Sequence, residues 1–444
     1  MADTDPSDTI SSIETATIRR ISRRLMPLLL ISYSIAYLDR VNVGFAALTA
    51  NKDLGLSPAV YGWGAGIFFV GYFLFEFPSN IILERVGARR WIARIMITWG
   101  LVSAAMALVT GPWSFTGVRF LLGLAEAGFF PGVILYLTYW FPRRYRARYI
   151  GMFMVGSMLA PLIGSPVSGL LLGLDGLLGV KGWQWLYILE AAPAVLLGVI
   201  ALGWLTDTPD KARWLTEEQR AWLKAALARE ASPRPHARRL GYLATLADVR
   251  VLFYALIFFN VTSPSYGLVL WLPQIVKGFG LSNAQTGFVA ALPYVFGTIA
   301  MLAWGRRSDR QGERRWHAAS CAFLAAAALG VCVVTTSPTL QMIAICVAAS
   351  GLYGLKGPWL SMVSESFLGV EAAGGIAMVS ALGNLSGFLP PYVVGWIKGA
   401  TGSYSLGLLL LAVLSLLGGA QLLYRNGFER RMAARPAVTG AASG

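Results

Sequence analysis

The sequence predicts an all-α membrane protein with twelve transmembrane helices, arranged as two six-helix halves related by pseudo-twofold symmetry. Of the 444 residues, 56% are hydrophobic and only 13% are charged, a composition too apolar for a soluble chain of this length. Twelve segments of about 20 mainly apolar residues fit along the chain with short connections. A charged loop motif also occurs once in each half of the chain. Together these observations indicate a duplicated helical bundle in a bilayer.

The polar head, residues 1–18, begins with acidic residues and lacks the basic region of a signal peptide, so we expect a disordered tail. Spans 1 to 6 form the N-terminal half, 19–205, and spans 7 to 12 form the C-terminal half, 249–424, followed by a tail at 425–444. The predicted spans are 25–48, 59–82, 91–109, 113–136, 149–173, 184–205, 250–273, 284–303, 317–335, 340–363, 372–396 and 403–424.

The gap at 206–248 is charged throughout and separates the two halves. A helical pattern runs from Thr216 to Arg229. Thr216 and Gln219 have the spacing of a capping box, in which each side chain accepts a hydrogen bond from the other residue's backbone N–H. We therefore expect a linker that contains one short helix.

The distribution of Lys and Arg predicts the orientation. Four of the 37 lie in loops after odd-numbered spans: Lys52, Lys181, Lys277 and Lys398. Three lie inside spans: Arg40, Arg119 and Lys356. The other 30 lie on the opposite side, with Arg94 extending to that surface, and basic loops face the cytoplasm. Both termini and the linker should therefore be cytoplasmic. The net charge of +15 is explained by a bilayer and does not require a nucleic-acid partner.

The sequence lacks the usual motifs for disulfides, metal binding and catalysis. The three cysteines lie in apolar runs and only two histidines occur, which disfavours a disulfide framework or a zinc site. The chain has no H-E-x-x-H or G-x-S-x-G motif. We expect no enzyme activity, no cofactor and no metal.

The repeated motif lies between the second and third span of each half. Gly87–Trp91 reads GARRW, and Gly312–Trp316, 225 positions later, reads GERRW. Glu84-Arg85 and Asp309-Arg310 match at the same offset. Parallel repeats of this kind build secondary transporters with a central site near the midplane. Acid–Arg pairs at helix ends can act as a latch, so we assign a gating role to Glu84, Arg85, Arg89, Asp309, Arg310 and Arg314.

The layout and several motifs resemble the major facilitator superfamily and, within it, the anion:cation symporter family. The motifs that carry the resemblance are Tyr37–Ala46 (YLDRVNVGFA), Phe77–Asn80 (FPSN), Arg119–Gly132 (RFLLGLAEAGFFPG), Gly182–Trp185 (GWQW) and Gly383-Asn384 with Gly387. The resemblance implies a bacterial inner-membrane permease for carboxylates such as tartrate, aldonates, aldarates, phthalate or nicotinate.

The first-half loop departs from the superfamily pattern. Asn80 and Glu84 stand where Gly and Asp are usual, whereas Gly305 and Asp309 keep the usual types. The geometry of the first-half loop is therefore in doubt.

Asp39 and Arg40 lie deep in span 1, where a charge is costly unless it is paired or faces a wet cavity. On the functional interpretation, Arg40 attracts a carboxylate and Asp39 takes part in proton coupling. Adjacent residues point about 100° apart on a helix. Each could therefore instead pair with a different neighbouring helix and only hold the bundle together.

Arg119 and Glu126 in span 4 are two turns apart and share one face. Burial favours the neutral form of a carboxyl group, so Glu126 is a second candidate for proton coupling, with Arg119 as a substrate contact. Salt-bridge scaffolding between spans 1 and 4 is the alternative.

Lys356 in span 10 could supply a second cation opposite Arg40, or extend to the surface as an ordinary lysine near a helix end. Further substrate-binding candidates are Asn384, Tyr37, Asn260 and Tyr266. Polar groups beside Pro and Gly can also merely cap backbone groups, and aromatic rings often only pack.

Glu76, Glu190 and Glu365 are expected to be structural acids that pair with loop arginines. Their expected partners are Arg143, Arg146 and Arg148.

Intramembrane cations together with an acid favour import of an organic anion by symport. The substrate would be a sugar acid, a dicarboxylate or an aromatic carboxylate. A negative-inside potential opposes anion uptake, so a coupling cation is needed; we expect the proton, with sodium as the alternative. We expect a monomer in the lipid bilayer. The competing function is export of drugs or metabolites by the same superfamily.

Overall fold

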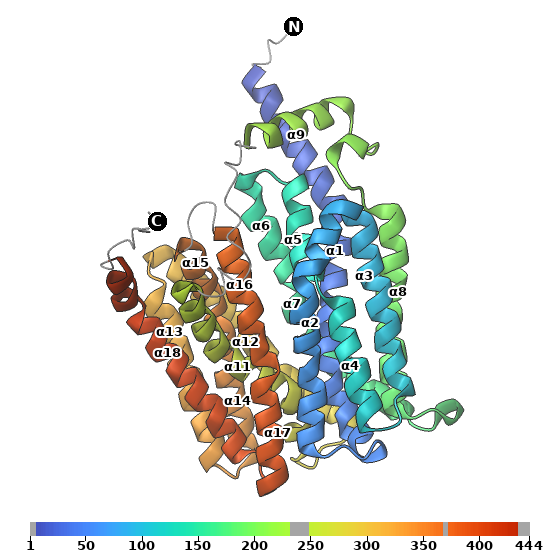
Figure 1. Cartoon of the computed structure of the whole chain (residues 1–444), viewed down its shortest axis with the longest axis vertical. Coiled ribbons are helices and arrows are strands. Elements are labelled where there is room, and N and C mark those ends of the chain that lie inside the picture. The colour runs from blue at the N-terminus through green and yellow to red at the C-terminus, as the bar shows by residue number, and fades with distance from the viewer. Residues whose placement is uncertain (1–5, 231–247, 367–371, 434–444) are drawn as a thin grey trace, which may run out of the picture.

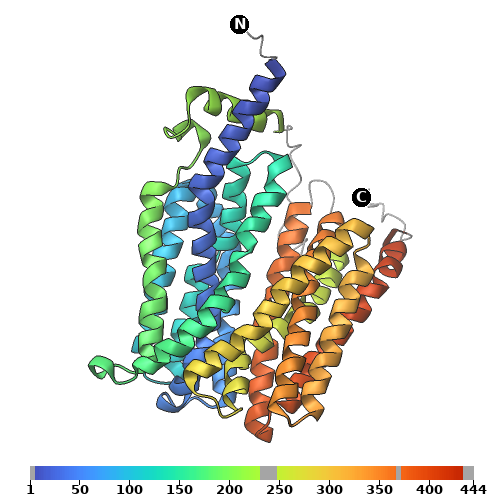
Figure 2. The same ribbon diagram turned by 180° about the vertical axis from the view of Figure 1, so that it is seen from behind.

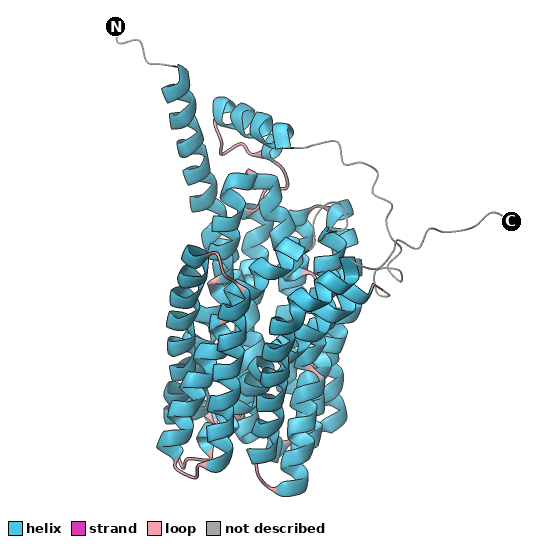
Figure 3. Cartoon of the chain, turned by 90° about the vertical axis from the view of Figure 1, so that its left-hand side faces the viewer, coloured by secondary structure: helices cyan, strands magenta, loops and turns pink. Residues whose placement is uncertain are grey.

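The computed structural model describes residues 6–230, 248–366 and 372–433, and this part of the chain is nearly all helix. Figures 1 and 2 show two helical bundles side by side, with the helices running along the long axis. Figure 3 shows the short loops that join them, and no strand occurs among the described residues. The expected fold class is confirmed.

The first bundle contains the helices up to the linker. They are α1 (Pro6–Asp53), α2 (Pro58–Val86), α3 (Ala88–Ala105), α4 (Pro112–Glu126), α5 (Phe129–Trp140), α6 (Arg143–Met154), α7 (Gly156–Leu171) and α8 (Gly182–Trp204). The linker holds α9 (Glu217–Glu230).

The second bundle contains the remaining helices. They are α11 (Val249–Lys277), α12 (Asn283–Gln311), α13 (Arg315–Val334), α14 (Pro338–Gly354), α15 (Lys356–Ser366), α16 (Ala372–Asn384), α17 (Leu389–Thr401) and α18 (Ser405–Ala433).

Among the described residues, ten helical segments are long and apolar enough to cross a membrane. The other two predicted spans are also helical. The first lies within α1, whose apolar stretch is interrupted by Asp39 and Arg40. The eleventh is divided between α16 and α17.

Two helices extend beyond the predicted boundaries at the ends of the chain. The head was expected to be disordered, but α1 already begins at Pro6. The reason is that Ile18 and Ile21 are buried in one hydrophobic cluster with Leu215 and Leu223 of the linker. At the other end α18 continues to Ala433, nine residues beyond the predicted span. The parts of both tails at 1–5 and 434–444 lie outside the described residues.

The predicted linker helix is confirmed. Gln219 N donates to Thr216 Oγ1 at 3.2 Å, and Thr216 N donates to Gln219 Oε1 at 3.3 Å. This reciprocal pair satisfies backbone donors at the start of α9. Helix α9 packs against α1, so the linker is attached to the first bundle.

Four predicted spans are each divided between two helices, and in the fifth span the α6/α7 break lies at Val155. The α4/α5 break follows Glu126, the α14/α15 break precedes Lys356, and the α16/α17 break follows Asn384. At the first break Gly128 has φ 88°, and a Cβ there would meet Ser79 Oγ at 2.1 Å, so only glycine fits. Three of the four breaks therefore adjoin a candidate functional side chain.

The two bundles are joined mainly at the end opposite the termini. Helices α2 and α17, α7 and α12, and α1 and α11 pack there in pairs. Close glycine contacts permit this: a Cβ on Gly287 of α12 would lie 2.5 Å from Ser165 O of α7. Tyr61 Oη donates to Leu270 O at 2.8 Å between α2 and α11.

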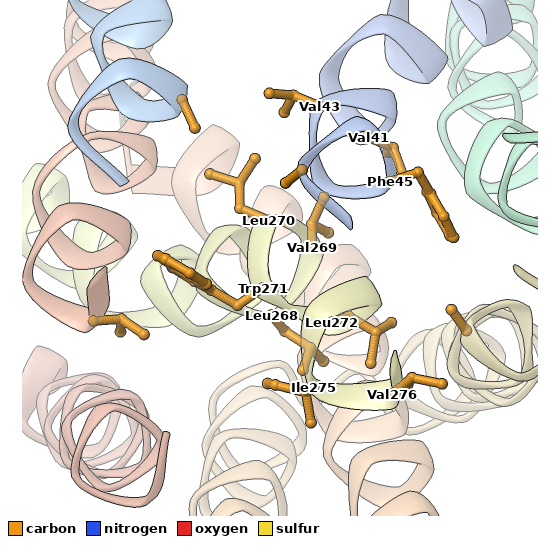
Figure 4. Packing of buried hydrophobic residues seen from close by; sticks show 14 of the residues in the cluster. Val41, Val43, Phe45, Leu268, Val269, Leu270, Trp271, Leu272, Ile275 and Val276 are labelled. Atoms are coloured by element: carbon orange, nitrogen blue, oxygen red, sulfur yellow. The ribbon is translucent and has the colours of Figure 1, made fainter. Parts of the chain in front are cut away.

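The buried hydrophobic clusters also join the two bundles mainly at the end opposite the termini. The buried cluster at that end draws on both bundles, and Figure 4 shows its α1 side chains (Val41, Val43 and Phe45) beside those of α11 (Leu268–Leu272). The other two buried clusters each belong to one bundle, apart from Tyr266 and Phe388, which reach the first bundle's cluster. Among the described residues, the bundles are thus closed together on one side and separate on the side of the termini.

Candidate functional site

An ion pair between α1 and α4 occupies the middle of the first bundle. Arg40 donates from Nε at 2.8 Å and from Nη2 at 2.5 Å to the same oxygen, Oε1 of Glu126. Glu126 is 1% exposed and Arg40 is 15% exposed. The second oxygen of Glu126 is buried and accepts no hydrogen bond from a described residue. Arg40 thus lies at the edge of the packed interior, and a small part of its side chain remains exposed.

Aromatic rings surround the guanidinium. Its carbon lies 4.9 Å from the ring centroid of Tyr72, 5.5 Å from Phe68 and 5.8 Å from Tyr37. Such rings stabilise a cation in a dry environment through their negative faces. Tyr37, a predicted substrate contact, therefore lies beside the Arg40–Glu126 ion pair.

Asp39 faces α3, away from Glu126, and has no cationic partner within 4.0 Å among the described residues. It accepts from Trp99 Nε1 at 2.7 Å, from Ser103 Oγ at 2.8 Å and from Asn42 Nδ2 at 3.1 Å. All three donors are neutral, and two come from α3. Asp39 therefore ties α1 to α3 and does not contact the Arg40 ion pair.

Arg119 is 1% exposed but has little polar contact. Its Nη2 donates to Ala65 O at 3.1 Å, and its guanidinium lies 5.1 Å from the Phe68 ring centroid. Nε and Nη1 are buried without a described acceptor. Arg119 and Glu126 share α4, but the carboxylate is bonded to Arg40 instead. Incomplete satisfaction of a buried cation is costly and marks a candidate anion contact.

The second bundle contributes Lys356, the first residue of α15. It is half-buried, its Nζ lies 4.2 Å from the ring centroid of Tyr353, and it has no ion pair among the described residues. Tyr353 is 2% exposed, and its ring lies edge-on to that of Tyr294 at 6.1 Å. Lys356 therefore lies beside buried aromatic side chains of the second bundle.

Asn384 and Tyr266 lie together at the α16/α17 break. Tyr266 Oη donates to Asn384 Oδ1 at 3.4 Å, and its ring lies edge-on to Phe69 of the first bundle at 4.6 Å. Asn260, by contrast, donates from Nδ2 to Gln421 Oε1 of α18 at 2.9 Å. The structure brings Tyr266 and Asn384 to the interface between bundles but places Asn260 inside the second bundle.

The two copies of the repeated loop differ in their ion pairs. In the second half Arg314 binds Asp309 at 2.5 Å. The equivalent Arg89 is paired with Asp207 of the linker, which also accepts from Arg89 N at 2.9 Å. Glu84, with Arg85 and Arg310, forms no ion pair with another described residue. Asp207 was not anticipated from the sequence, because it lies 118 positions from its partner.

The expected partners of the structural acids were wrong. Glu190 accepts from Ser168 Oγ at 2.6 Å in the membrane interior, and Glu365 lies 4.0 Å from Arg314. Glu76 forms no ion pair within the described part of the chain.

Two of these loop positions, Arg143 and Arg146, instead contact the linker. Glu230 accepts from the backbone N of Arg143 at 2.8 Å and from Arg146 Nη2 at 3.3 Å. This contact fastens the end of α9 to the first bundle.

Comparisons with known proteins identify the kind of molecule to which this arrangement belongs. The family model described as Major Facilitator Superfamily matches residues 29–388 and 265–439. A protein of Agrobacterium vitis named "Putative tartrate transporter" is 50% identical over 407 residues, 92% of this chain and 90% of that protein. A quinolone resistance transporter of Acinetobacter baumannii is 44% identical over 406 residues, 91% of this chain and 94% of that protein. Among solved structures, an inward-facing, unoccupied bacterial homologue of the human lysosomal transporter Spinster has a TM-score of 0.76 at 16% identity, covering 91% of this chain and 97% of that one.

Proposed function

The chain belongs to the Major Facilitator Superfamily of multi-pass membrane transporters, and from this premise we propose that it imports a tartrate-like dicarboxylate together with protons. The activity of this class is transport of a small molecule, not catalysis. The 50% identical relative named as a tartrate transporter supports the substrate class. We also propose that the two bundles move as units, that both termini face the cytoplasm, and that the site serves a monomer.

The observation that carries the proposal is the Arg40–Glu126 ion pair. Both contacts fall on one oxygen of Glu126, so the carboxylate neutralises Arg40 without a bidentate match. A proton on Glu126 removes its negative charge and frees the guanidinium for a substrate carboxylate, which accepts two parallel N–H donors. Proton and anion uptake are coupled in this way, because protonation of Glu126 favours anion binding to Arg40, and anion binding to Arg40 favours protonation of Glu126.

The other cations support a substrate with two acidic groups. Lys356 has no carboxylate partner in the described structure, and Arg119 keeps two unused donors. Tyr37, Tyr266 and Asn384 add hydroxyl and amide groups that can bind the hydroxyls of a sugar acid or tartrate. Asp39 remains a second candidate for proton coupling, with its effect transmitted through α1.

The test is uptake of labelled tartrate into proteoliposomes with an inwardly directed proton gradient. Arg40→Ala should lower the initial rate more than a hundredfold, because a charge-assisted contact in a dry site is lost. Arg94→Ala is the matched control: it removes a half-buried arginine stacked on Trp91, away from the site, and should keep the rate within about twofold. Equal rates for both variants at matched reconstitution would exclude the anion site.

Export of a drug is the second candidate, favoured by the 44% identical quinolone resistance transporter and by the aromatic rings around Arg40. Cells expressing the protein should then accumulate less fluoroquinolone than cells with the Arg40→Ala variant. An unchanged drug content together with tartrate uptake would decide for import.

A further inference from the structure

A hollow of about 510 Å³ lies beside the N-terminal part of α1, outside the transport site. Four arginines of α1 line it, together with Ala16 and Trp214: Arg19, Arg20, Arg23 and Arg24. We call these four residues the α1 arginine cluster. Arg19 and Arg23 are one turn apart, as are Arg20 and Arg24, so the four side chains form two adjacent rows on the helix.

Within the described part of the chain, the α1 arginine cluster has no carboxylate partner. None of the four forms an ion pair with a described residue, and nearby acids are engaged elsewhere. Glu14 of α1 pairs with Arg144, and Asp207 pairs with Arg89. Four like charges within six residues repel one another. Since no described carboxylate neutralises these charges, the hollow is a candidate site for an anion from outside the chain.

The position of the cluster is that of a membrane–water interface. The apolar part of α1 begins at Leu25, directly after Arg24. Trp204, at the end of the apolar helix α8, donates from Nε1 to Arg24 O at 2.6 Å and is 43% exposed. Exposed tryptophans at span ends mark the headgroup level of a bilayer.

Arg24 and Trp214 give the hollow a fixed wall. The Arg24 guanidinium stacks 4.4 Å from the Trp204 ring and 5.3 Å from the Trp214 ring. Trp214 in turn stacks on Trp140 of α5 at 5.3 Å. Arg24 Nε is buried and has no described acceptor. The hollow thus contains one buried donor without an acceptor, Arg24 Nε, beside three exposed arginines.

We propose that this hollow binds the phosphate headgroup of an anionic phospholipid from the adjoining leaflet. Guanidinium groups bind phosphate oxygens through paired N–H donors, and basic pockets at the ends of spans attract acidic headgroups. A free phosphate shares this chemistry. The lipid is favoured because the hollow adjoins the apolar part of α1 and the exposed Trp204 ring, where acyl chains lie.

The experiment compares the wild-type protein with the triple variant Arg19→Gln/Arg20→Gln/Arg23→Gln. Arg24 is left intact because it packs between two tryptophans. The matched control, Arg306→Gln/Arg307→Gln/Arg315→Gln, removes three arginines on the same side of the second bundle. Each purified protein is titrated with dioleoylphosphatidylglycerol, dioleoylphosphatidylcholine or inorganic phosphate, and bound lipid is counted by native mass spectrometry. Gel filtration and Tm measurements check that the variants fold. If the triple variant does not fold, the single variant Arg23→Gln replaces it.

Each arginine near a charged lipid surface contributes enough for roughly a fivefold change in affinity. We expect the cluster variant to bind phosphatidylglycerol at least tenfold more weakly, with the control within about twofold of wild type. Phosphatidylcholine should bind equally weakly to all three proteins. Unchanged phosphatidylglycerol affinity in the cluster variant, or an equal loss in the control, would overturn the proposal. Inorganic phosphate binding as tightly as the lipid would also overturn it, in favour of a soluble anion.

Discussion

Glu126→Gln provides the sharpest test of coupling, because the glutamine has nearly the shape of the protonated acid and cannot lose a proton. In the structure, Glu126 competes with the substrate for Arg40 through contacts of 2.8 and 2.5 Å. Removing its charge weakens the competitor and leaves the guanidinium in place. The variant should therefore bind substrate well and fail to couple.

The magnitude follows from the contact that is lost. A hydrogen bond to a charged group contributes about 1.5–3 kcal/mol, and 1.4 kcal/mol corresponds to tenfold in Kd. At alkaline pH, where the competing carboxylate is charged in the wild type, Glu126→Gln should bind tartrate about ten- to hundredfold more tightly. At acidic pH the two proteins should approach the same Kd.

Calorimetry in detergent at pH 5.5 and pH 8.5 measures the binding, and proteoliposomes measure the coupling. We expect the variant to exchange labelled for unlabelled tartrate but not to accumulate it under a proton gradient. Asp39→Asn is the comparison, since Asp39 is bonded only to neutral donors. A Kd for Glu126→Gln that is weaker than wild type at pH 8.5, or that keeps the wild-type pH dependence, would refute the competition between acid and substrate.

Three further predictions concern affinity, conformation and stability. Lys356→Met should raise the substrate Kd about ten- to hundredfold if the ammonium binds the anion; a change below about threefold by calorimetry would assign the residue a structural role. Gly287→Ala places a Cβ 2.5 Å from a carbonyl of α7, and overpacking of roughly 1–3 kcal/mol should slow uptake at least fivefold, whereas Gly330→Ala, where a Cβ meets nothing within 4 Å, should not. Burial favours the neutral form of Glu313, but hydrogen bonds from backbone N–H groups and the imidazole at the start of α13 hold its pKa below the ordinary 4.5. The resulting stability is full above pH 4.5 and lost as pH falls through the lowered pKa, so Glu313→Gln should destabilise by roughly 0.3–1 kcal/mol at pH 7 and by less at pH 3; equal unfolding free-energy differences at both pH values would contradict this.

Hydropathy and charge were sufficient to predict the bundle, because span length and loop charge are properties of contiguous sequence. The helix breaks beside Glu126, Lys356 and Asn384 were not predicted. The chain has 49 glycines, many of them in spans, so a glycine alone does not mark a break. At Gly128 a glycine is required because the side chain of Ser79 on another helix leaves no room for a Cβ, which no local pattern records.

The pairing within the site was likewise beyond local spacing. Two turns of one helix place Arg119 and Glu126 on one face, yet Glu126 binds Arg40. That choice depends on how α1 is rotated against α4, and the rotation is fixed by contacts such as Asp39 with Trp99 on α3. Asn260 shows the same limit, because its partner Gln421 is 161 positions away.

The buried acids are divided unequally between the bundles. Asp39, Glu126 and Glu190 are all in the first, while no Asp or Glu is buried among the described residues of the second. On the proposed function, the acids of the first bundle would therefore couple transport to the proton gradient. Lys356 and Asn384 of the second bundle would contribute much of the substrate recognition. Such a division lets cargo preference diverge by substitutions confined to α14–α17 while the ion-coupling apparatus is inherited unchanged. Relatives that share the first bundle's acids but differ in the second should then carry different solutes with the same driving ion.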